Sequence, residues 1–171
     1  MSDEIVNKVA QSGIITLDLA SFRPEGARVT IDIADHLWQG IALKEKDFRD
    51  WIKSVDWSSY QGKHVAIFCS ADAVIPSWAY MLLSSHLSPF AATIHYGDES
   101  SLEEILFRNS IMEMNFEKYT DERIMLKGCG DSVPMGSYVY LTNALTPVVK
   151  SLMFGEPCSA VPVYKAKKKN Q

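Results

Sequence analysis

The chain contains three cysteines, and each follows a segment that has the composition of a β-strand. Cys69 comes directly after the apolar run 65–68, Cys129 follows the segment 123–126, and Cys158 follows the segment 151–154. In open α/β sheets, functional groups gather at the carboxyl ends of the strands, because the turns that lead into the helices converge there. The spacing therefore predicts three thiols at one edge of a sheet.

Two aspartates, Asp72 and Asp131, lie in the turns that contain the first two cysteines. Three thiolates and one carboxylate could hold a tetrahedral zinc ion, and soft thiolates also favour iron. We therefore predict a zinc or iron site whose candidate ligands are Cys69, Cys129, Cys158, Asp72 and Asp131. The chain has no C-x-x-C pair, so the fold would have to bring every ligand together. The aspartates could instead bond to local backbone N–H groups, or act as an acid/base pair.

Two other interpretations of the cysteines stay open. Cysteine is a small apolar residue that is often buried in a core, without any chemistry. Alternatively, each turn runs into the N-terminus of a helix, where the helix dipole can lower the pKa of a thiol and make it a nucleophile. Neighbouring turn residues could support a metal ligand or bind an anion, and these are Ser70, Ser77 and Gly130; Ser77 is also a candidate helix N-cap. Gly128 and Gly130 lack the third glycine of a dinucleotide fingerprint, which argues against nucleotide binding.

The segments that would position these turns are similar to one another. At a shift of 59 positions, Phe48-Arg49 aligns with Phe107-Arg108 and Tyr60 with Tyr119. At a shift of 58, Pro76 aligns with Pro134 and Tyr80 with Tyr138. The pattern predicts two duplicated αβαβ repeats, 41–98 and 99–156, preceded by an N-terminal segment, 1–40, and followed by a C-terminal segment with a basic tail, 157–171. The alternative is that two ordinary units have converged on one hydrophobic pattern.

The periodicity predicts an α/β fold with a mainly parallel sheet and helices on both faces. The segments 14–19 and 29–33 alternate apolar and polar residues around Pro24 and Gly26, which predicts an N-terminal β-hairpin after a short opening helix, 5–11. Helices are expected at 44–55, 78–87, 102–114 and 137–145, and strands at 65–68, 93–96, 123–126 and 151–154. The segment 78–87 is apolar nearly all round, so we expect a buried helix. A last edge strand is expected at 160–164, because Pro162 would interrupt a central ladder.

Composition narrows the classes of function. A chain of 171 residues is long enough for a single domain with its own core. The net charge of −4, with acids and bases interspersed, argues against a nucleic-acid-binding protein. No segment is apolar enough to cross a membrane, and the first residues do not have the pattern of a signal peptide. We therefore expect a cytoplasmic protein whose three thiols are reduced.

Three stretches carry a resemblance to a known family: CSADAVIPSWAYMLL from Cys69, KGCGDSVP around Cys129, and GEPCSAVPVYK around Cys158. They resemble the uncharacterised bacterial family catalogued as domain of unknown function 2480, and the likeness covers nearly the whole chain. The resemblance implies no catalytic residue. It implies an association with iron–sulfur assembly, which favours a metal or thiol role.

Three functions follow as hypotheses from these residues and patterns. The first is an accessory protein with a thiolate metal site, structural or for metal transfer. The second is a non-catalytic scaffold or dimerisation module, which binds a second copy or another protein through an apolar surface formed by the matched aromatic helices and the hairpin. The third is a thiol-dependent enzyme. In the second case Tyr80 and Tyr138 are packing residues whose hydroxyl groups find hydrogen-bond partners.

Overall fold

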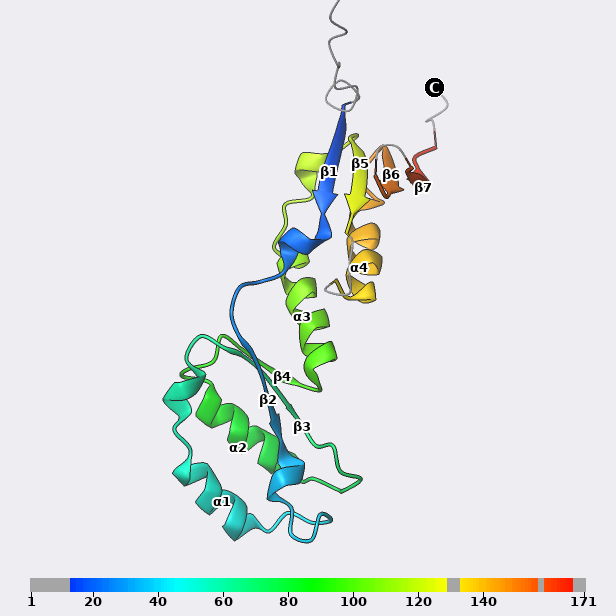
Figure 1. Cartoon of the computed structure of the whole chain (residues 1–171). Coiled ribbons are helices and arrows are strands. Elements are labelled where there is room, and N and C mark those ends of the chain that lie inside the picture. Colours follow the sequence, from blue (N-terminus) through cyan, green and yellow to red (C-terminus); the bar gives the residue numbers. More distant parts are fainter. Residues whose placement is uncertain (1–12, 129–132, 157–158, 168–171) are drawn as a thin grey trace, which may run out of the picture. The chain divides into compact units, whose positions relative to one another are not determined.

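The computed structural model describes residues 13–128, 133–156 and 159–167, and it divides the chain into two compact units (Figure 1). Unit 2 is the continuous stretch Glu25–Ile105, and unit 1 combines Met1–Pro24 with Leu106–Gln171. The sequence of unit 2 is therefore inserted between two parts of the sequence of unit 1. Each unit has its own sheet and its own hydrophobic core.

Unit 2 is built on three parallel strands in the order β2 (Arg28–Asp32), β3 (His64–Phe68) and β4 (Thr93–Tyr96). Helix α1 (Glu45–Ser54) and the short helix η3 (Trp57–Tyr60) connect β2 to β3, and α2 (Ser77–Leu87) connects β3 to β4. Successive right-handed crossovers in one direction place both helices on one face of a sheet, and Figure 1 shows α1 and α2 on the same side of these strands. Ile31, Val65 and Ile67 face the core that these helices cover.

Unit 1 has a four-stranded sheet in the order β1 (Ile14–Asp18), β5 (Arg123–Lys127), β6 (Ser151–Phe154) and β7 (Val161–Lys165). The first three strands are parallel, and β7 is antiparallel to β6. Its helices are α3 (Glu99–Met112), whose first residues belong to unit 2, η4 (Glu117–Tyr119) and α4 (Met135–Leu145). The core gathers Leu19, Phe107, Ile124, Leu141 and Leu152.

The two units share one element order and several equivalent backbone hydrogen bonds. In each, a strand and a short 3-10 helix, η1 (Leu19–Phe22) or η2 (Ile33–His36), precede an α-helix, a 3-10 helix, a central strand, an α-helix and a third strand. Gly97 N donates to Ile67 O at 3.0 Å, and Gly155 N donates to Leu126 O at 2.9 Å. The predicted duplication is not established by this likeness alone, but the likeness gives equivalent positions in the two units.

The α/β class and the mainly parallel pairing are confirmed, while several details of the prediction were wrong. The described residues form two sheets and not one, and β1 and β2 do not form the predicted N-terminal hairpin, because β1 pairs with β5 and β2 with β3. An alternating apolar pattern suits either pairing, and it does not identify a parallel neighbour far along the chain. The first strands of the two units, β1 and β2, both lie in the predicted N-terminal segment, 1–40, and the duplicated repeats stay a prediction. The opening helix, 5–11, lies outside the described residues.

Two details of α2 also differ from the prediction. Its N-cap is Pro76, without a side-chain hydrogen bond, so Ser77 is the first helical residue and not the cap. The helix buries Ala79, Leu83 and Leu87 but leaves Met81 69% exposed, so it is not buried all round. An apolar residue in a helix is buried only where another element covers it. The periodicity of the sequence does not show which side of the helix is covered.

Gly97 should be the glycine most sensitive to substitution in unit 2. It follows β4 at a φ of +141°, and a Cβ added there would collide with Ser101 Oγ. We expect Gly97→Ala to lower the free energy of unfolding by about 2–3 kcal/mol. Gly40→Ala is the control, because Gly40 has φ +72° with open space around it, and we expect it to cost about 1 kcal/mol.

Tryptophan fluorescence in a urea titration measures this effect selectively. All four tryptophans, Trp38, Trp51, Trp57 and Trp78, belong to unit 2. Their signal therefore reports the unfolding of this unit and not of unit 1. Equal effects of the two substitutions would show that the packing around Gly97 is looser than the structure indicates.

Candidate functional site

The predicted thiol site is described only at Cys69. This residue follows the central strand β3, is half-buried, and packs against the core of unit 2. Its thiol donates a long hydrogen bond to the carbonyl of Ala71, at 3.7 Å. Ser70, Asp72 and Ser77 belong to the segment that leads from β3 into α2, and Ser70 is exposed.

The other predicted ligands, Cys129, Cys158 and Asp131, lie outside the described residues, as does Gly130. Whether the three thiols meet therefore stays a prediction. Within the described part of the chain, no group of three or more His, Cys, Asp or Glu side chains could hold a metal ion.

Asp32 is a residue that the sequence patterns above did not single out, and it ties together the carboxyl ends of two strands. It is the last residue of β2, and its Oδ1 accepts from Ala34 N at 2.9 Å and from Ser70 N at 3.0 Å. Burial raises the pKa of Asp32, but hydrogen bonds from the Ser70 side chain and from these two N–H groups outweigh burial. The pKa therefore lies below the ordinary value of 3.8.

A sequence signal for this aspartate exists. Thr16-Leu17-Asp18-Leu19-Ala20 and Thr30-Ile31-Asp32-Ile33-Ala34 share the pattern T-x-D-x-A with an aliphatic residue at each x. In both units the aspartate ends the first strand and caps the following 3-10 helix; Asp18 Oδ1 accepts from Ala20 N at 3.1 Å. In unit 1, Lys127 Nζ also approaches Asp18 Oδ2 at 3.4 Å.

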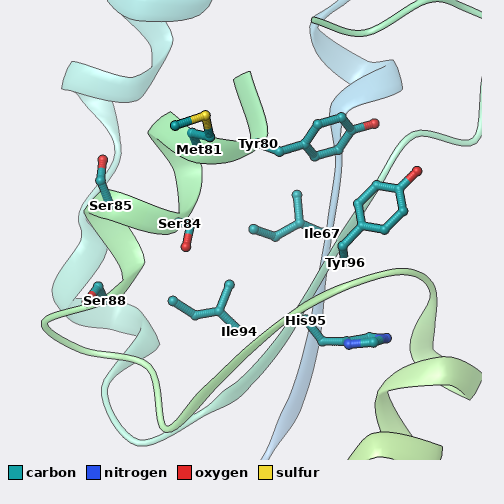
Figure 2. Close-up of a pocket in the computed structure, with 9 residues that line it drawn as sticks. All are labelled: Ile67, Tyr80, Met81, Ser84, Ser85, Ser88, Ile94, His95 and Tyr96. Atoms are coloured by element: carbon teal, nitrogen blue, oxygen red, sulfur yellow. The ribbon is translucent and has the colours of Figure 1, made fainter. Parts of the chain in front are cut away.

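A groove of about 550 Å³ lies between α2 and β4 in unit 2 (Figure 2). Ile67 and Ile94 lie on its inner side, and Tyr80 and Tyr96 at one end, with their rings edge to face at a centroid distance of 5.1 Å. Met81 and three serines come from the α2 segment, while the ring of His95 points to the opposite side of β4. Tyr96 is 72% exposed, so the groove offers aromatic and aliphatic surface to solvent.

The groove offers few groups for acid–base chemistry. Its lining contains no Asp, Glu, Lys or Arg, and the ring of its one histidine, His95, points to the opposite side of β4. Burial raises the pKa of Tyr80 above its ordinary value, and the negative charges that Tyr96, Cys69 and Asp32 can carry raise it further. Tyr80 therefore keeps its proton at neutral pH and serves as a packing and hydrogen-bonding residue.

The corresponding place in unit 1 holds a strand of the chain itself. A groove of about 430 Å³ is lined by Leu126, Tyr138, Thr142 and Phe154, at the positions equivalent to Ile67, Tyr80, Ser84 and Tyr96. Tyr138 and Phe154 repeat the edge-to-face contact at 5.6 Å. Here β7 pairs with β6 and adds Val161 and Val163 to the lining.

The fold and the grooves define an α/β protein of two similar parallel-sheet units, each with an aromatic groove beside its third strand. Comparison with protein families matches residues 3–166 to the family described as "Protein of unknown function (DUF2480)", and the chain belongs to that family. The resemblance carried by the cysteine-containing stretches is therefore confirmed. No curated protein and no solved structure matches the chain. Among the described helices, none has the length and apolar character needed to span a membrane.

We expect the free energy of unfolding of unit 2 to decrease at acidic pH because Asp32 becomes protonated. Because its pKa is lowered in the folded chain, its stabilisation is present above the ordinary, unfolded pKa of 3.8 and is lost as the pH falls through the folded value. Asp32→Asn should reduce the loss of stability between about pH 6 and pH 3, measured by tryptophan fluorescence in urea. Asp18→Asn, in unit 1, is the matched control and should leave that signal unchanged. An Asp32→Asn variant with the same pH dependence as the native chain would contradict this role.

Proposed function

We propose that this protein is a non-catalytic protein-binding module whose binding surface is the α2–β4 groove of unit 2. The observation that carries the proposal is the difference between the two grooves. In unit 1 β7, a strand of the same chain, pairs with β6 and lines one side of the groove, whereas within the described residues no strand pairs with the outer side of β4. The unit 2 groove therefore leaves room for a segment of another protein.

The exposure of equivalent residues supports this proposal. Leu152 of β6 is fully buried, but its counterpart Ile94 in β4 is only half-buried. Phe154 is 38% exposed, and its counterpart Tyr96 is 72% exposed. The residues beside β4 therefore have apolar surface still to bury, and each ~100 Å² of it is worth about 2.5 kcal/mol when removed from water.

The residue types at the groove also favour binding over catalysis. Tyrosine provides a large apolar ring with a polar tip, and methionine adapts its shape to a partner, so both are common at protein interfaces. Tyr80, Tyr96 and Met81 provide this combination on one surface of unit 2. The absence of charged side chains from the lining favours an apolar, uncharged partner surface.

A photo-cross-linker placed at the groove tests the proposal. We expect p-benzoylphenylalanine in place of Tyr96 to give a discrete protein adduct on irradiation in living cells, identified by mass spectrometry. The same group in place of Lys46, an exposed residue of α1, is the control and should give none. If the cross-linker at position 96, or in place of the groove residue Met81, yields no more adduct than at position 46, the groove is not a protein-binding surface.

The thiolate metal site is the second candidate function. The observation that favours it is the place of Cys69, which is half-buried at the carboxyl end of the central strand and whose sulfur makes a long contact with Ala71 O. A thiol held this way can lose its proton to a metal without breaking a strong hydrogen bond. The further ligands would be Cys129, Cys158 and an aspartate, Asp72 or Asp131. Such a site would suit an accessory protein that holds or transfers zinc or iron.

Metal analysis decides this second candidate. If the thiolate site forms, the purified chain should hold about one zinc or iron ion, and Cys69→Ser combined with Cys129→Ser should lose it. Chelation should then also lower the stability of the native chain but not of the double variant. A native chain that is free of metal, with stability unchanged by chelator, would remove this function and leave the binding module untouched.

A further inference from the structure

We propose that the partner of unit 2 binds as an added β-strand: an extended segment with apolar side chains at alternate positions, antiparallel to β4. The inference rests on the proposed function and specifies how the groove is used. Its precedent lies within the chain, because β7 adds to the equivalent strand β6 in that direction. β7 also provides the pattern of the ligand, with Val161 and Val163 over the groove.

The backbone of β4 can accept such a strand. Gly97 N donates to Ile67 O of β3, and N–H groups along a parallel strand point alternately to its two sides. The N–H groups of Ile94 and Tyr96 therefore point away from β3, toward the free edge. Their counterparts in unit 1, Leu152 and Phe154, pair with Tyr164 and Val161 of β7. The two outward N–H groups of β4 are thus the donors that an added strand would engage.

The side chains of β4 do not protect its edge against pairing. Proteins commonly block exposed sheet edges with lysine, proline or a bulge. The outer strand of unit 1 has all three devices: Pro162, Lys165 and a shift of register opposite Leu152 and Met153. β4 consists of Thr93, Ile94, His95 and Tyr96, and has none of them. An edge that is unprotected, and lies next to an exposed apolar groove, is suited to strand addition.

The groove restricts the chemistry of the added segment. Its lining has no charged residue, so side chains that enter it should be uncharged. Two positions of the segment, separated by one residue, reach the groove, as Val161 and Val163 do in unit 1. A β-branched residue at both positions fits the extended backbone and the apolar lining.

The test uses the full chain and a synthetic peptide with the sequence of residues 159–166, SAVPVYKA, capped at both ends. We expect the peptide to bind and a scrambled peptide to bind much more weakly. Hydrogen exchange of the Ile94 and Tyr96 amides, measured by NMR, should slow in the complex.

Two substitutions distinguish the contribution of the backbone N–H group from that of the side chain. Tyr96→Ala and Tyr96→Pro both remove the ring, but only proline also removes the outward N–H. Tyr96→Pro should therefore bind the peptide more weakly than Tyr96→Ala by on the order of tenfold.

Several results would overturn this inference. Unchanged exchange at Ile94 and Tyr96 on peptide binding, with equal affinities for the two variants, would show that the groove binds without strand addition, and the proposed function would survive. No binding of the peptide would reject the ligand pattern, while the cross-link at position 96 tests the proposed function independently. A concentration-dependent dimer that is lost in Tyr96→Pro but kept in Tyr96→Ala would show that a second copy occupies the edge. The exchange measurement on the native chain decides the matter even if Tyr96→Pro does not fold.

Discussion

Hydrogen bonding along the outer side of the third strand is the constraint that distinguishes the two units. A backbone N–H or C=O group that loses water must find another partner. In unit 1 the chain supplies that partner itself through β7, which pairs with β6 from Ser151 to Phe154. In unit 2 the corresponding side of β4 has no strand from the described part of the chain. The same parallel sheet is therefore extended in one unit and open in the other.

The carboxyl ends of the strands are fixed by short-range hydrogen bonds in both units. Asp32 and Asp18 accept from the N–H groups two residues ahead, which turns the chain sharply after the first strand. Asp32 also accepts from Ser70 N, so the turn after β2 and the turn after β3 are joined. These bonds hold the segment that contains Cys69 beside the groove, in a position set by the fold and not by the thiol.

Much of the fold could be predicted from the sequence, because its elements have strong local patterns. The strands β4 and β6 match the predicted 93–96 and 151–154, and β3 and the four helices agree within about three residues, the usual uncertainty of an element boundary. The predictions that failed concern which strands pair, because these pairs join residues far apart in the chain. The sequence of β1 does not show that it pairs with β5. The two copies of T-x-D-x-A lie close together in the chain, so their strands were interpreted as a hairpin and the repeat was not recognised. The groove was missed for a similar reason. Tyr96 is apolar enough to suggest a core position, and the sequence does not show that no described strand lies beside β4 to cover it.

The two units differ in residue type at several equivalent positions. Lys127, which approaches Asp18 in unit 1, has Phe68 as its counterpart in unit 2, and Gly128 has Cys69. Phe154 is replaced by Tyr96, which adds a hydroxyl group at the open end of the groove. In unit 1 β7 thus pairs with the outer side of β6, whereas no described strand pairs with β4 in unit 2, where Cys69 and Tyr96 lie near Tyr80. Because each unit has its own core, a substitution at the β4 edge can leave the packing of unit 1 intact.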